Sequence, residues 1–184
     1  MGNSEIEKIC KQIYKKHKDA LDLIFEFKPD IQSDISDYLQ SLIKSEPSLI
    51  LDSYGKSVIR FTSENIDKVM PKISEGWTKS NRLILFEFNN YADRLALRFY
   101  LGPGDIEKRQ SLYNFFSEKG DLFTLTKQGL YKKWNCLYQH DFLKKKDYED
   151  KEYPELIEKI DKKWAEFKSG ELVEIELYIS KWTP

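Results

Sequence analysis

The stretch at residues 26–30 holds the side-chain types that a metal-dependent nuclease needs. Glu26 and Lys28 stand two residues apart, and Asp30 follows after a proline. In such enzymes carboxylates hold a Mg²⁺ ion, and a lysine positions the water or stabilises the charge that develops on the phosphate. That chemistry requires an aspartate first and the acidic-x-lysine triplet later, on an adjacent strand. Here the order is reversed at the predicted end of a helix, so we interpret the stretch as a capped helix terminus.

A second acidic triplet, Glu87-Phe88-Asn89, lies at the end of an apolar strand pattern, where either Asp52 or Asp67 could serve as the upstream acid. Asn89 stands where the chemistry needs a lysine and cannot supply its positive charge. Glu87 also alternates with apolar residues, as a solvent-facing strand residue does. A divergent metal-dependent phosphodiesterase therefore remains an alternative, and we predict no catalytic residue.

The cysteines and histidines form the only other set of metal-binding side chains. Cys10 and His17 are seven residues apart, and Cys136 and His140 are four apart, so each pair would share a helix face. Together they have the composition of a tetrahedral zinc site, but the spacing fits no standard finger, and cysteine often fills apolar cores. Neither G-x-S-x-G, a Walker A loop nor G-x-G-x-x-G is present. We predict no metal and no cofactor.

The distribution of charge suggests a binding surface. Residues 127–146 carry six lysines and one acid, a net charge of +5, whereas residues 147–176 carry eleven acids and five lysines, a net charge of −6. Tyr131, Trp134 and Tyr138 are interleaved with the basic residues. Lysines that bind phosphates, together with aromatic rings on which bases stack, form a nucleic-acid surface. The alternative is a solvated strand face that the acidic segment neutralises.

The expected contact surface combines this basic segment with basic residues of one strand and of the helix that follows it. On the strand 93–101, Arg94 and Arg98 fall on the more polar side of an apolar alternation, and guanidinium groups suit phosphate or carboxylate partners. The full set of predicted nucleic-acid or partner contacts is Arg94, Arg98, Lys108, Arg109, Lys132, Lys133, Trp134, Lys144, Lys145 and Lys146.

Helical periodicity marks the N-terminal part of the chain. Apolar residues recur every three or four positions over 5–28, which predicts an amphipathic helix that Pro29 ends. A second helix from Asp30 would end near Pro47. We therefore expect a helical hairpin over residues 1–47 followed by an α+β domain over residues 48–184.

From residue 49 onward the pattern becomes that of strands. LILD and SVIRFT flank a turn, and RLILFEF and DRLALRFYL are the clearest strands. Asp105 is expected to cap a helix, residues 129–138 to be extended, and residues 154–167 to form a helix. ELVEIELYISKW fits a helix or a final strand, and we favour a helix. The predicted fold class is α+β: an N-terminal helical hairpin followed by an antiparallel sheet packed with helices.

Composition limits the classes of protein to consider. The chain has 184 residues, 40% apolar and 14% aromatic, and 30 basic against 31 acidic residues, so a histone-like cationic protein is excluded. It has no apolar run of membrane-spanning length and no apolar segment typical of a secretion signal at its start. Two cysteines form no disulfide framework. We expect a cytoplasmic protein without a membrane partner, and the oligomeric state stays open.

Four segments follow in order along the chain: IYKKHKDALDLIFEFKPD, LRFYLGPGDIEKRQSLYNFF, LYKKWNCLYQHDFL and DYEDKEYPELIEKI. They resemble the C-terminal part of bacterial and phage proteins of the PD-(D/E)xK nuclease superfamily, over nearly the whole chain. In that family the nuclease core lies N-terminal to the first segment, and Met1 here stands just before it. No position matches the family's metal-binding acids or its lysine. The resemblance therefore implies a non-catalytic accessory half.

The resulting functional expectation is a non-catalytic accessory or binding domain that contacts nucleic acid or a partner protein. One alternative is a protein-interaction module, such as an inhibitor or subunit in a bacterial or phage defence system. Its basis is the balanced charge and the 4 Trp, 11 Tyr and 11 Phe, since aromatic side chains often anchor interfaces. The other alternative is the divergent phosphodiesterase with Glu87.

Overall fold

A computed structural model describes residues 3–27, 29–125 and 129–183, which fall into two compact units, Met1–Asp30 and Ile31–Pro184. The first unit contains two helices, α1 (Asn3–Lys16) and α2 (Lys18–Phe27). One continuous helix was expected over 5–28, but the chain bends at His17. A hydrogen bond of 2.7 Å from the Tyr14 hydroxyl to Asp22 joins the two helices across the bend. Lys28 of the acidic-x-lysine triplet lies outside the described residues.

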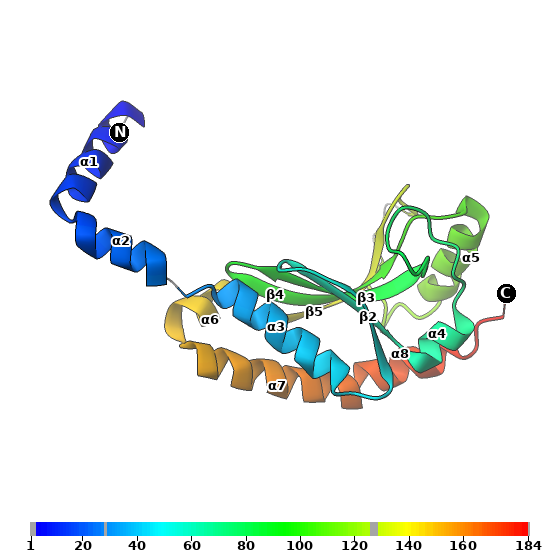
Figure 1. Cartoon of the computed structure of the whole chain (residues 1–184). Helices are drawn as coiled ribbons and strands as arrows, with labels where there is room; N and C mark the ends of the chain where they lie inside the picture. The colour runs from blue at the N-terminus through cyan, green and yellow to red at the C-terminus, as the bar shows by residue number, and fades with distance from the viewer. Residues whose placement is uncertain (1–2, 28, 126–128, 184) are drawn as a thin grey trace. The chain divides into compact units, whose positions relative to one another are not determined.

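The second unit is built around five strands, and Figure 1 shows helices gathered along one side of the sheet. Its elements, in chain order, are α3 (Ile31–Lys44), β1 (Leu49–Tyr54), β2 (Val58–Ser63), α4 (Glu64–Val69), β3 (Ile84–Tyr91), β4 (Arg94–Leu101), α5 (Ile106–Ser117), β5 (Asn135–Leu143), α6 (Lys145–Asp150), α7 (Tyr153–Ser169) and α8 (Glu171–Ile179).

The sheet is an antiparallel meander in which every strand pairs with the next one along the chain, in the order β1-β2-β3-β4-β5. The α+β class predicted from the alternating pattern is confirmed. The segment 171–179, which fitted either a helix or a strand, is the helix α8. Asp105 caps α5 as predicted, since its carboxylate accepts a 2.9 Å hydrogen bond from the Lys108 amide.

The helix α3 belongs with the sheet. Its Ile35, Leu39 and Ile43 are completely buried in the core that it shares with the strands. The boundary between compact units therefore follows Asp30, and not residue 47 as expected. The physical reason is that the apolar face of α3 finds the large apolar face of the sheet, which the local sequence does not reveal.

The core on the helical face of the sheet is aromatic. Phe86 stacks on Phe99 with 4.4 Å between ring centroids, and Phe61 stacks on Phe86 at 5.2 Å. From α7, Trp164 and Phe167 pack edge-on against these rings. Truncating one such buried Phe to Ala typically costs about 3–5 kcal/mol. This face is thus closed by α3, α7 and α8.

No helix among residues 3–27, 29–125 and 129–183 has both the length and the apolar character needed to cross a membrane.

Candidate functional site

A row of polar side chains crosses the face of the sheet opposite the aromatic core. Its members are direct cross-strand neighbours, one from each of the five strands, and we call them the polar row: Ser53, Arg60, Glu87, Arg98 and Gln139. Successive side chains of a strand point to opposite faces. Because Phe61, Phe86 and Phe99 face the helices, the residues that precede or follow them must face away. The alternation that made Arg98 a candidate is therefore correct.

Glu87 is neutralised inside the polar row. Its Oε2 accepts a 2.7 Å hydrogen bond from Nε of Arg60, and its Oε1 accepts one of 2.5 Å from the Asn89 side-chain amide. The residue is only 7% exposed. Both oxygens of this carboxylate are thus engaged by the protein, and the Glu87–Arg60 pair contributes no net charge to the face.

Arg98 carries the uncompensated charge of the row. Its Nε donates to the Gln139 side-chain oxygen at 3.0 Å, and its Nη1 donates to the Tyr100 hydroxyl at 3.0 Å. Burial raises the pKa of Tyr100, so this phenol is neutral at physiological pH. Within the described part of the chain, no carboxylate lies within ion-pairing distance of Arg98. A guanidinium whose hydrogen-bond partners are uncharged keeps its positive charge and can bind an anion from outside the protein.

Two tryptophans flank a hollow of about 180 Å³ beside the row, which Trp77 and Trp134 line together with Arg60, Glu87 and Tyr100. Trp77 lies against the backbone of Gly102, where a Cβ atom would be 2.1 Å from its Cε3. The Arg60 guanidinium lies 5.6 Å from the Trp77 ring centroid. Trp77 is thus fixed, whereas Trp134 is 45% exposed and accessible to a ligand.

Arg109 holds the loop that carries Trp134. Its Nε donates to the carbonyl of Gly102 at 2.7 Å, and its two terminal nitrogens donate at 2.8–3.1 Å to the loop acceptors, which are the carbonyls of Tyr131, Lys132 and Lys133 and Oδ1 of Asn135. Arg109 is 1% exposed. The expectation that it lines an accessible contact surface is corrected, because its guanidinium is surrounded by acceptors of the chain itself. It positions the site.

The other predicted contacts divide into two groups. Lys132 and Lys133 are exposed in the loop next to Trp134, and Lys133 Nζ lies 5.6 Å from the Trp134 ring centroid. Of the predicted contacts, Trp134 lines the hollow, Lys132 and Lys133 precede it in the same loop, and Arg98 is hydrogen-bonded to Tyr100, which also lines the hollow. The remaining residues are exposed elsewhere: Arg94 beside the Tyr91 ring, Lys108 on α5, and Lys145 and Lys146 on α6 near Glu149 and Asp150.

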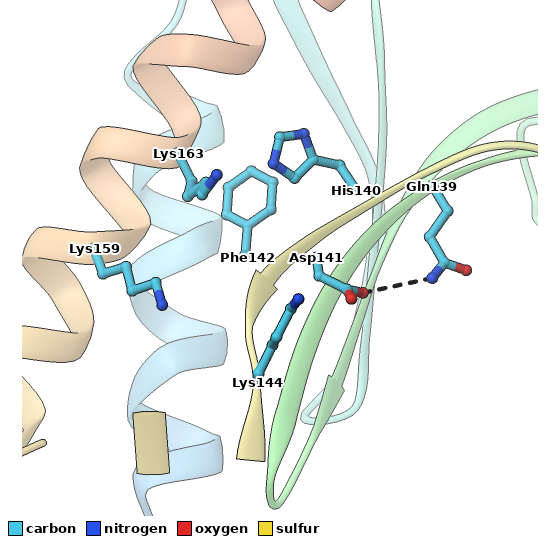
Figure 2. Close-up of a pocket in the computed structure, with 7 residues that line it drawn as sticks. All are labelled: Gln139, His140, Asp141, Phe142, Lys144, Lys159 and Lys163. Atoms are coloured by element: carbon cyan, nitrogen blue, oxygen red, sulfur yellow. Dashed lines mark hydrogen bonds between the residues drawn. The ribbon is translucent and has the colours of Figure 1, made fainter. Parts of the chain in front are cut away.

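Lys144 lines a separate hollow of about 540 Å³, shown in Figure 2. We call it the edge groove, and its lining is Gln139, His140, Asp141, Phe142, Lys144, Lys159 and Lys163. Four consecutive residues of β5 line it, and consecutive strand residues point to opposite faces, so the groove must run along the strand's edge. β5 is an outer strand of the sheet. The opposite wall is α7, whose Lys159 binds Asp147 at 2.6 Å.

The acids considered for metal chemistry are engaged by arginines. Asp52 and Asp67 each accept a 2.7 Å hydrogen bond from the same Arg82 side chain. The Arg82 hydrogen bond holds the pKa of Asp67 below its ordinary value. Among the residues that the structure describes, no group of three His, Cys, Asp or Glu side chains is arranged to hold a metal ion.

Three residues that line the hollow were not singled out from the sequence: Arg60, Trp77 and Tyr100. Arg60 has the same alternation signal as Arg98, since it stands between apolar neighbours on its strand. Trp77 lies in the irregular segment between α4 and β3 and meets Gly102 only through the tertiary fold. The burial of Arg109 did have a local signal, because Arg109, Leu112 and Phe116 share the buried face of α5 at helical spacing.

Comparisons of the chain with protein-family models, curated proteins and solved structures found no match. The resemblance to the PD-(D/E)xK superfamily accordingly stays a prediction.

Proposed function

We propose that this protein binds single-stranded nucleic acid without cutting it, through Arg98 of the polar row and the loop residues Lys132, Lys133 and Trp134. The observation that supports this most directly is that Arg98, which has no carboxylate partner, donates a hydrogen bond to Tyr100, and that Tyr100 and the exposed Trp134 line the same hollow.

The chemistry of the surface matches a single strand better than a duplex. Unpaired bases stack on exposed aromatic rings, each worth about 1–3 kcal/mol, and their phosphates bind lysine and arginine. Trp134 offers an exposed indole, and the two lysines beside it offer mobile charges. Of the five side chains that line the hollow, three come from the strands β2, β3 and β4, and the two tryptophans come from the segments that precede β3 and β5. The hollow is therefore built on the rigid sheet.

The test is fluorescence anisotropy with labelled single-stranded DNA, single-stranded RNA and duplex DNA over a series of salt concentrations. The double variant Lys132→Glu/Lys133→Glu should weaken single-strand binding and lower the magnitude of the log–log salt slope by about 1.4, because each single-strand phosphate contact contributes about 0.7. The matched control Lys68→Glu/Lys162→Glu makes the same change in charge at exposed positions of α4 and α7.

The control should retain wild-type affinity and salt slope. Absence of binding by the wild-type chain would refute the proposed function, and an equal loss in both double variants would refute the assigned surface.

A second candidate function is binding of a partner protein, and the edge groove favours it. An outer strand offers unpaired backbone groups to an added strand, and the lining holds three lysines and one acid, Asp141. Lys159 is paired with Asp147 and Lys163 with Glu166, which leaves Lys144 as the main positive charge of the groove. An extended acidic segment is the partner that fits. A labelled peptide of alternating Glu and Val should then bind the wild-type chain and lose affinity on Lys144→Glu/Lys163→Glu. A Lys-Val peptide that binds equally well would exclude this reading.

A further inference from the structure

The first compact unit exposes an unusual number of large apolar side chains. Eight of them are 42–70% exposed, and they are Ile6, Ile9, Ile13, Tyr14, Leu23, Ile24, Phe25 and Phe27. Over residues 4–27 no side chain is buried. Exposed apolar patches of this kind on a folded chain mark interaction surfaces.

The two helices do not cover each other's apolar residues within one copy. Only His17 separates α1 from α2, so they follow one another around a bend, and the Tyr14–Asp22 hydrogen bond and the Lys18–Asp22 ion pair hold that bend. Helices of 14 and 10 residues are marginal in water on their own. A partner that buries these side chains would stabilise both helices.

The charges of the two helices identify a fitting partner. In α1, four lysines oppose two glutamates, which leaves a net charge of +2, whereas in α2 one lysine opposes Asp19, Asp22 and Glu26, which leaves −2. An apolar helix of opposite charge is the complement of each. The chain itself supplies that complement, because α2 of a second copy is acidic and apolar where α1 of the first is basic and apolar.

We infer that residues 3–27 form a self-association element in which α1 of one copy packs against α2 of a second copy. The arrangement is reciprocal, so the two copies form two equivalent α1–α2 contacts and the assembly closes as a dimer. Pairing of α1 with α1, or of α2 with α2, would oppose like charges and is disfavoured. The element adds an assembly function to the binding surfaces of the second unit.

The mass of the full chain in solution, measured by light scattering after size exclusion, tests the first part. The experiment is run with a reducing agent, because Cys10 on α1 is exposed and could form an unrelated disulfide. The wild-type chain should show twice its mass of 21.9 kDa. Ile9→Asp/Ile13→Asp should be monomeric, while near-UV circular dichroism shows that the second unit remains folded.

Charge reversal tests the pairing itself and leaves every apolar residue in place. Lys15→Glu/Lys16→Glu changes α1 from +2 to −2, and Asp19→Lys/Glu26→Lys changes α2 from −2 to +2. Each variant alone then opposes like charges in both contacts, and its dimerisation should weaken by about tenfold or more. An equimolar mixture of the two variants restores both attractions and should recover wild-type dimerisation as a heterodimer.

A wild-type chain that stays monomeric at every concentration measured overturns the proposal. Charge-reversed variants that dimerise alone as well as the wild type, or a mixture that gains nothing over its components, overturn the α1–α2 pairing. Recovery confined to the mixture supports it, since an unrelated partner or a lipid surface would not respond to mixing.

Discussion

Arg109 and Gly102 are joined by a 2.7 Å hydrogen bond from the guanidinium Nε to the carbonyl oxygen, and this bond connects the two walls of the candidate site. Trp77 packs directly on the backbone of Gly102. The other nitrogens of Arg109 hold the loop that carries Trp134. One buried side chain therefore fixes the backbone behind both tryptophans. Substituting Arg109 should lower both the stability of the fold and the affinity for a ligand.

Arg109→Met should lower the free energy of unfolding by about 3 kcal/mol or more, because the buried Gly102 carbonyl, the buried Asn135 side-chain oxygen and three partly buried loop carbonyls lose their donor. Urea unfolding followed by circular dichroism measures the change. Arg94→Met removes an exposed guanidinium and should change stability by no more than about 0.5 kcal/mol. Equal effects of the two substitutions would contradict the role assigned to Arg109.

Gly102→Ala should destabilise the fold by about 1–3 kcal/mol, because its Cβ would overlap the Trp77 ring and force it to move. In a Trp77→Ala background the same substitution should cost much less, and a double-mutant cycle of thermal or urea unfolding gives the coupling energy. Gly55→Ala is the matched control, since no atom lies within 4 Å of its Cβ position. Additive effects of Gly102→Ala and Trp77→Ala would contradict the contact.

Trp134→Ala should reduce affinity for single-stranded nucleic acid by about 1–3 kcal/mol, the value of one base-stacking contact, while Trp134→Phe should retain most of it. Isothermal titration calorimetry gives both affinities. Quenching of Trp134 fluorescence on binding, read as the difference between the wild type and Trp134→Phe, provides an independent signal. Trp134→Phe binding as weakly as Trp134→Ala would argue against stacking.

Asp67 should make stability depend on pH at the acidic end of the range. Its hydrogen bond from Arg82 lowers its pKa in the folded state, so the carboxylate contributes stability above its unfolded pKa, and this stability is lost as the pH falls through the folded pKa. Asp67→Asn should therefore be less stable than the wild type near neutral pH, and the difference should shrink as the solution is acidified below the ordinary aspartate pKa. Urea unfolding at several pH values measures it, with the exposed Glu75→Gln as control. A stability difference between Asp67→Asn and the wild type that grows on acidification would contradict this prediction.

The elements of the second unit were largely predictable because their signals are local. Alternation within 93–101 reports directly which side chains face the core, and Asp105 caps the helix that follows it. The association of α3 with the sheet was not predictable in this way, since it depends on an apolar surface assembled from distant strands. The bend at His17 has no evident local breaker such as Pro or Gly.

The candidate site was half predictable for the same reason. Arg98 and Trp134 follow from alternation and from the mixture of aromatic and basic residues. Whether an arginine meets solvent or carbonyl oxygens depends on where a separate loop runs, and Arg109 meets a loop more than 20 residues away along the chain. Likewise, Arg60 neutralises Glu87 because the register of β2 against β3 places the two residues directly opposite each other.

The cross-strand order of Arg60, Glu87 and Arg98 also bears on how the meander avoids mispairing. In a sheet with one dry and one wet surface, sliding a strand by a single position turns every side chain over. Such a slip in β3 would drive Glu87 into the layer of phenylalanines and turn Phe86 and Phe88 toward the charged side chains of the polar row. The sequence thereby disfavours the nearest incorrect alignments, and the same three charged residues that shape the binding face help the chain select one fold.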